Sequence, residues 1–116
     1  MGISYEGIGE WCATFGCGKV KEGNVVKVSA NGSADACSAG DSFCGVVRAI
    51  ARDGKACSVQ LGGIATVNYS GESAPIPGYG KLSADAAGGV SVDASKGREY
   101  LILAADSAAK TVTIKL

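Results

Sequence analysis

The sequence predicts an all-β fold: a small barrel or sandwich built from two similar β-units, with an extended N-terminal arm. Three observations support this fold class. Apolar and polar residues alternate in several short stretches, as they do in strands with one buried face. No stretch keeps a 3.6-residue apolar period for three turns, so no helix is expected. The 116 residues include 18 glycines, which favours tight turns between short strands.

Two hairpins give the strongest strand signals. The first joins residues 43–50 to residues 57–61 through the turn sequence RDGK, in which Asp-Gly tolerates the positive φ of a tight turn. The second joins residues 99–105 to residues 111–116 through DSAAK at 106–110. We expect the inward face of the 57–61 strand to carry Cys57, Val59 and Leu61, and the other face to carry Ser58 and Gln60.

Two further strands are expected over residues 24–30 and 63–69. The first ends at the turn-forming pair Asn31-Gly32. The second is followed by SGESAPIPGYG, in which two prolines forbid regular strand pairing.

A repeated pattern predicts that the chain contains the same β-unit twice. KVSANGSADAC starts at Lys27 and KLSADAAGGV starts at Lys81, while CSVQL and VTIKL lie 55 residues apart. Short strings of Ala, Ser and Gly also recur by chance, but two matches in the same order and spacing favour a true repeat. We therefore expect a single β domain over residues 23–116, with units at about 23–70 and 78–116 and the Pro-rich segment near 71–80 as the joint.

Residues 1–22 lie outside the repeat and are predicted to form an N-terminal arm. The arm is rich in glycine but contains large apolar side chains, namely Ile3, Tyr5, Ile8, Trp11 and Phe15. Two interpretations remain open at this point. The arm caps the open end of the barrel, or it binds another protein by adding an extended strand to a sheet edge and seating its aromatic side chains in pockets.

Composition limits the classes of partner. Eleven basic and eleven acidic residues give a net charge of zero, so no positive field recruits nucleic acid or an anionic membrane. There is no apolar run of about 20 residues to span a bilayer and no secretory signal pattern. We expect no nucleic-acid partner, no membrane partner, and use in a reducing compartment or on a particle assembled in one.

No catalytic or metal site is expected, and no cofactor. Histidine, the commonest general base and metal ligand, is absent from the sequence. The five cysteines are scattered rather than paired at zinc-ligand spacing, so free thiols are the favoured interpretation. They are Cys12, Cys17, Cys37, Cys44 and Cys57. The aspartates fall in expected turns, where they serve the backbone.

The span EGNVVKVSANGSADACSAGDSFCGVVRAIARDGKACSVQLGGIATV resembles the small capsid decoration proteins of tailed bacteriophages and prophages. The matching features are the strand from Gly23 to Ala30, the G-D-x-F-x-G-V motif at 40–46, and the turn at 63–67. The closing segments GYGKLSADAAGGVSV and REYLILAADSAAKTVTIKL are also similar to the end of that family. The resemblance covers about residues 22–116, and the arm at 1–22 matches no part of the family pattern.

The resemblance implies a β-barrel-like structural protein on the outside of a phage head, made in the host cytoplasm. It implies the major capsid protein as partner and a homotrimer at local threefold axes that stabilises the shell. From the chemistry of the arm, we expect the shell contact at Ile3, Tyr5, Ile8, Trp11 and Phe15. The alternatives are another virion part, such as a head-fibre or tail component, or a small-ligand or metal-binding barrel that uses Cys12 and Cys17.

Overall fold

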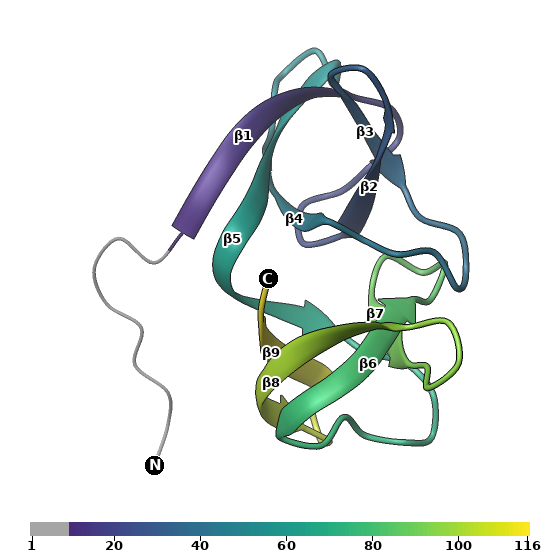
Figure 1. The fold of residues 1–116 in the computed structure, drawn as a ribbon. Coiled ribbons are helices and arrows are strands. Elements are labelled where there is room, and N and C mark those ends of the chain that lie inside the picture. Colours follow the sequence, from purple (N-terminus) through teal and green to yellow (C-terminus); the bar gives the residue numbers. More distant parts are fainter. Residues whose placement is uncertain (1–9) are drawn as a thin grey trace.

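The computed structural model describes residues 10–116, and this part of the chain is all-β, with nine strands and no helix (Figure 1). Residues 1–9 lie outside the described part. The strands are β1 (Glu10–Cys17), β2 (Val25–Ala30), β3 (Ser33–Ala36), β4 (Gly45–Ile50), β5 (Ala56–Asn68), β6 (Gly78–Ala84), β7 (Val90–Val92), β8 (Arg98–Asp106) and β9 (Thr111–Lys115).

The first five strands form a closed barrel, in the upper half of Figure 1. Their order is β1-β3-β2-β4-β5, and β1 closes the barrel by pairing antiparallel with the first half of β5. The contact between β1 and β3 is parallel and joins only two residue pairs, at Gly16 and Cys17. All other pairings in this barrel are antiparallel.

The second half of the chain repeats the pairing order of the first. The C-terminal half of β5 pairs with β9, which pairs with β8, then β6, then β7. An isolated parallel bridge between Tyr69 and Val90 then links the end of β5 to β7, as β1 is linked to β3 in the first barrel. Both units therefore have four antiparallel pairings and one short parallel contact, which supports the repeat predicted from the sequence.

The register of the two units also agrees. Val47 of β4 faces Val59 of β5, and 55 residues later Ile102 of β8 faces Ile114 of β9. Both strand pairs also contain a β-bulge at the equivalent position. The bulge lies between Val47 and Ala49 in β4, and between Ile102 and Ala104 in β8. Conservation of a bulge and its register between the two halves is difficult to obtain by chance, because bulges interrupt pairing at specific positions.

The boundaries of the units differ from the sequence-based expectation. The strand expected over 63–69 is continuous with the one over 57–61, and together they form the 13-residue β5 shared by both barrels. Pairing with β1 ends at Gly63, pairing with β9 begins at Ile64, and Gly63 has a φ of +88° that glycine adopts without strain. The joint is thus β5 itself, and the Pro-rich segment lies inside the second unit.

The predicted arm boundary after residue 22 is also corrected. Residues 10–17 form β1, which is a full member of the first barrel rather than part of an arm outside it. The expectation missed this strand because glycine and cysteine weaken the alternation that marks a strand.

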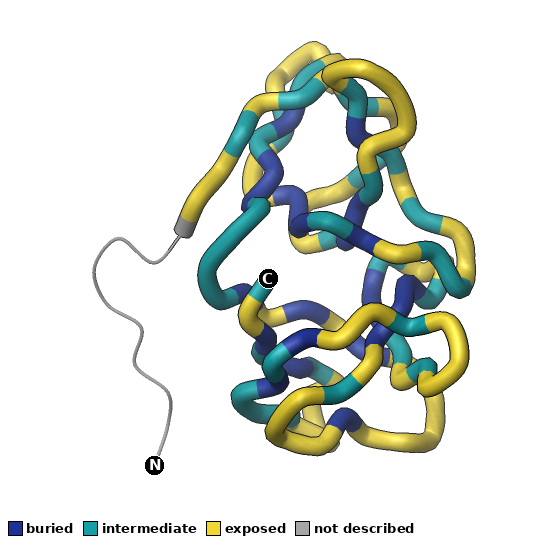
Figure 2. Tube along the Cα trace, viewed as in Figure 1, coloured by how far each residue is buried: buried dark blue, intermediate teal, exposed yellow. Residues whose placement is uncertain are grey.

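Two apolar clusters hold the molecule together. The smaller one fills the first barrel with Val26, Ala34, Val47, Cys57 and Val59. The larger one fills the second barrel and also includes Val25, Phe43 and Val46 from the first. Figure 2 shows the buried residues along the strands and the exposed ones mainly on the turns. The shared cluster makes the packing of one barrel depend on the other.

Gln60 contradicts its expected position on a solvent face, because its side chain is fully buried. It lies at the point where β5 passes from one barrel to the other and both faces of the strand are covered. Its Nε2 donates to the carbonyl oxygens of Gly62 and Ile64, at 3.0 Å each. The amide therefore donates to two carbonyl groups at the point where β5 passes from one barrel to the other.

We expect Gln60→Leu to lower the free energy of unfolding by about 1–2 kcal/mol, because two partly buried carbonyl groups lose their donor. The Gln60 Oε1 atom is buried and has no hydrogen-bond partner among the described residues. Its removal is favourable and offsets part of the lost stability. Urea unfolding followed by circular dichroism measures the change. Ser58→Ala, on the same strand, is the control and should change stability by less than about 0.5 kcal/mol. Equal stability of Gln60→Leu and wild type would contradict this account.

Candidate docking surface

The structure places the sequence-predicted contact residues in different environments. Ile3, Tyr5 and Ile8 lie outside the described residues. Trp11, at the start of β1, is 66% exposed. Phe15 is instead half-buried and packs against the cluster inside the first barrel, so it stabilises the barrel rather than projecting toward a partner.

A β-bulge explains why the two aromatic residues of β1 separate. Trp11 and Phe15 are four apart and would share a face of a regular strand. The register of β1 against β5 shifts between Trp11 and Cys12, which turns Trp11 away from the barrel interior. The Trp11 ring lies over Gly62, where an added Cβ would come within 3.2 Å of the indole Cε3. Because Gly62 has no side chain, the Trp11 ring can pack directly against the β5 backbone.

One edge of β1 is open in the described part of the chain. Residues 10–16 pair with β5 on one side, and the other side pairs with β3 only at residues 16 and 17. Unpaired N–H and C=O groups along a strand edge are a template for another extended chain. The open edge and the exposed Trp11 form one continuous surface at the N-terminal end of the first barrel, hereafter the β1 edge.

A second candidate surface is an apolar groove of about 460 Å³ on the second barrel. We call it the Tyr79 groove. Its rim carries Ile76, Tyr79 and Val92, which are 78%, 73% and 44% exposed. It is lined by Ser73, Ala74, Pro75, Ile76, Pro77, Tyr79, Gly80, Lys81, Leu82, Val92 and Ile102. Lys81 is the single charged side chain among these residues.

Local sequence explains the shape of the Tyr79 groove. Pro75 and Pro77 lack an N–H group and fix φ, so the segment before β6 cannot join the sheet and forms a wall beside it. Gly80 has no side chain to cover the floor, where an added Cβ would lie 3.0 Å from Cδ1 of Ile102. This groove was not predicted from the sequence, although an isoleucine between two prolines, in a segment that cannot pair, was a signal for it.

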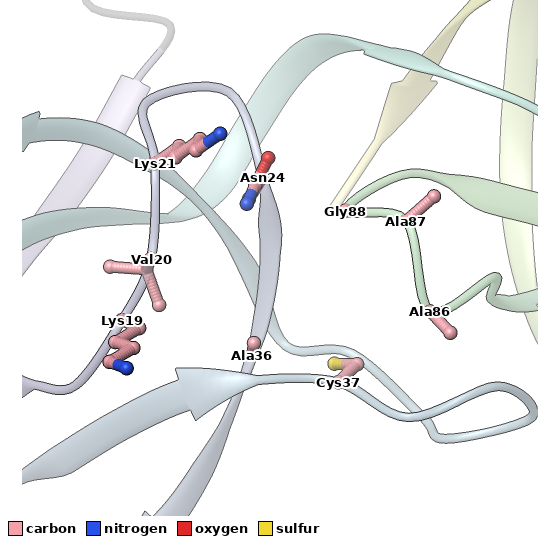
Figure 3. Close-up of a pocket in the computed structure, with 9 residues that line it drawn as sticks. All are labelled: Lys19, Val20, Lys21, Asn24, Ala36, Cys37, Ala86, Ala87 and Gly88. Atoms are coloured by element: carbon pink, nitrogen blue, oxygen red, sulfur yellow. The ribbon is translucent and has the colours of Figure 1, made fainter.

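A third hollow lies between the two barrels and has a volume of about 560 Å³. Figure 3 shows Lys19 and Lys21 on one side and the turn Ala86–Gly88 on the other. A backbone bond from Val25 N–H to the Gly88 carbonyl (2.9 Å) joins its two sides. Small residues (Ala36, Ala86, Ala87 and Gly88) form much of the lining of this inter-barrel groove, and Lys19, Lys21 and Asn24 supply its polar side chains.

The five cysteines in the described part of the chain are free thiols. Within residues 10–116, no three His, Cys, Asp or Glu side chains are grouped so that they could hold a metal ion. Cys12 is exposed and Cys17 is partly buried in the first barrel, because residues five apart on a strand point to opposite faces. Burial raises the pKa of the Cys37 thiol to about 11, and burial beside Cys17 does the same for Cys57. Both thiols therefore stay protonated at neutral pH.

The turn that follows Val92 at the groove rim depends on one carboxylate. Asp93 accepts hydrogen bonds from the Lys96 backbone N–H (2.9 Å) and the Ser83 hydroxyl (2.9 Å), and further bonds from Ser95. These bonds lower the pKa of Asp93 from 3.8 to about 2, although the partial loss of solvent opposes the shift. The ionised form thus stabilises the turn that positions Val92.

Because the folded-state pKa is depressed, Asp93 contributes stability above its unfolded pKa and loses that contribution as the pH falls toward 2. We expect Asp93→Asn to have a lower Tm than wild type at pH 7. The difference should narrow steadily between about pH 4 and pH 2, as wild type loses the same interaction. Thermal unfolding in matched buffers measures both. A difference that stays constant over this range would contradict the role given to the Asp93 carboxylate.

Comparisons with known proteins add no family assignment. No protein-family model matches the chain, and a search of curated proteins finds no match. The described residues contain no helix long and apolar enough to cross a membrane.

Proposed function

We propose that the protein is a structural component of a phage virion, a capsid decoration protein that binds the outside of the head and stabilises it. The observation that carries the proposal is the β1 edge, where an unpaired strand edge and an exposed tryptophan adjoin the apolar N-terminal segment. The sequence resemblance over about residues 22–116 suggests which surface the protein binds, namely the outside of a phage head. The proposed role requires binding alone and no catalytic step.

The shell contact is proposed to use Ile3, Tyr5 and Ile8 together with Trp11. An extended segment that adds to a sheet edge gains main-chain hydrogen bonds, and its alternate side chains enter pockets. Tryptophan is enriched among residues that dominate the binding energy of interfaces. Phe15 is not included, because it packs inside the first barrel.

Stabilisation of the head would follow from many weak contacts. One copy that touches two or more capsid subunits makes each later contact effectively intramolecular, which strengthens binding without a new interaction. We propose the major capsid protein as the partner and three copies around each local threefold axis, on the outer surface of the virion. In this arrangement each trimer opposes the separation of neighbouring subunits.

The test is co-sedimentation of the purified protein with undecorated heads of its own phage, with bound copies counted per head. We expect saturation at three copies per local threefold site. Trp11→Ala should weaken binding by about 30-fold or more, the loss of a dominant interface residue. Val28→Ala is the matched control, because Val28 is also exposed (54%) but lies on β2.

Three results would contradict the proposal. Absence of binding to heads would exclude decoration, and recovery of the protein with purified tails would assign it to another virion part. Equal weakening by Trp11→Ala and Val28→Ala would remove the β1 edge from the contact.

A further inference from the structure

The Tyr79 groove is the largest concentration of exposed apolar side chains in the described part of the chain. Three of the five large apolar residues that are exposed there, Ile76, Tyr79 and Val92, stand on its rim. The groove floor includes Leu82 and Ile102, which belong to the core of the second barrel. An exposed apolar surface that continues into the core marks a binding site for an apolar partner.

The chain itself contains a segment whose chemistry matches the groove. Residues 2–9, GISYEGIG, carry the large apolar side chains Ile3, Tyr5 and Ile8, and their single charge is Glu6. The single charged side chain that lines the groove is Lys81, of opposite sign. We propose that, in the free protein, Ile3 and Tyr5 of this segment lie in the Tyr79 groove of the same chain, with Glu6 beside Lys81.

The segment is long enough to reach the groove. The described chain begins at Glu10, which pairs with Gly63 of β5, and the Gly63 carbonyl accepts the Leu116 N–H at the end of β9. Adjacent on β9, Lys115 pairs with Leu101 of β8, which pairs with Tyr79 of β6. The start of β1 is thus four strand spacings from Tyr79, or about 19 Å. The five extended residues from Glu10 back to Tyr5 span about 16 Å and the four back to Glu6 about 13 Å, so the long side chains of Tyr5, Glu6 and Lys81 cover the remaining distance.

Extended geometry also suits the side-chain pattern. Ile3 and Tyr5 are two residues apart and share one face of an extended chain, so both can enter the groove together. Glu6 then lies on the opposite face, where the long and exposed side chain of Lys81 can reach it from the groove lining. Docking within one chain is favoured over exchange between copies, because a short tether gives an effective concentration in the millimolar range.

Zero-length cross-linking with a carbodiimide tests the proposed pair directly. The reagent activates the Glu6 carboxylate, the Lys81 amine attacks it, and an amide forms while the carbodiimide takes up the water as a urea. Peptide mass spectrometry of the monomer should show a Glu6–Lys81 link. The ion pair between Lys27 and Asp41, at 2.7 Å, is an internal positive control. Glu6→Gln should remove the first link and leave the second.

A groove variant separates docking from random collision of the segment with Lys81. Ile76→Ser combined with Tyr79→Ser should lower the yield of the Glu6–Lys81 link by about tenfold, as expected when an apolar site worth about 1.4 kcal/mol is lost. Both residues are exposed, so the fold should be retained. Val28→Ser is the matched control and should leave the yield unchanged.

Three outcomes would overturn the inference. They are the Lys27–Asp41 link without the Glu6–Lys81 link, an unchanged yield in the groove variant, and a Glu6–Lys81 link found in cross-linked dimers instead of monomers. The inference concerns the free protein and does not depend on the proposed role on phage heads. Failure of head binding would therefore leave it intact.

Discussion

Phe43→Ala is expected to lower the free energy of unfolding by about 3–5 kcal/mol, the usual cost of removing a buried phenylalanine ring. Phe43 precedes β4 in the first unit, but it is 1% exposed and packs within the core of the second. Its ring stacks on Tyr100 of β8 with centroids 4.7 Å apart and planes 7° from parallel. Loss of this ring would leave a cavity at the contact between the two barrels.

The connection has a second component that can be tested separately. The Tyr100 hydroxyl donates a buried hydrogen bond of 2.7 Å to the Phe43 carbonyl oxygen. Tyr100→Phe keeps the stacked ring and removes the bond, so we expect a smaller loss of about 1–2 kcal/mol. Chemical unfolding of both variants measures the two costs.

The position of Phe43 also predicts how the protein unfolds. Because the ring ties the first unit to the core of the second, the two barrels should unfold in a single transition in wild type. Separate unfolding transitions for the two barrels in wild type would contradict the shared core. So would a decrease of less than about 1 kcal/mol in the free energy of unfolding of Phe43→Ala.

The sequence was sufficient to predict the strands that alternate strongly. The hairpins over 43–50 and 57–61, and over 99–105 and 111–116, correspond to β4–β5 and β8–β9. The turn at Asp53-Gly54 is confirmed by a φ of +73° at Gly54. These elements are predictable because each has one face in a core and one face in solvent, which fixes a period of two.

Other elements could not be predicted because they depend on contacts distant in the sequence. β3 and β7 are four and three residues long, too short to show a period, and each is held in place by its partner strands. The continuity of β5 and the burial of Gln60 follow from the two barrels sharing one strand. The alternation of apolar and polar residues along a strand does not indicate that both of its faces are covered.

The candidate surfaces, too, could be predicted only where local sequence determines them. Trp11 could be found as a large apolar residue in a glycine-rich segment, and the structure leaves it exposed. Phe15 was assigned the same role because the bulge that separates the two side chains depends on pairing with β5. The Tyr79 groove was missed because its floor comes from β6 and β8, brought together by the fold.

Gly45→Ala is expected to lower the free energy of unfolding by about 2–3 kcal/mol, because β4 and β5 are too close there for a side chain. An added Cβ would clash with the Gln60 carbonyl oxygen and would lie 2.7 Å from Cγ1 of Val59. Both neighbours are fully buried, so relief requires movement of the β5 backbone. Overpacking of this kind costs about 1–3 kcal/mol or more, and the lower entropy of unfolded alanine returns only about 0.4–1 kcal/mol.

Gly16→Ala provides the matched control for Gly45→Ala. Gly16 also lies in a strand of the first barrel, but an added Cβ would have its nearest neighbour at 3.6 Å, an ordinary contact. We expect its stability to stay within about 0.5 kcal/mol of wild type, or to rise slightly. Urea unfolding of both variants compares them directly. If Gly45→Ala were as stable as Gly16→Ala, the close approach of β4 and β5 would not be what requires glycine at position 45.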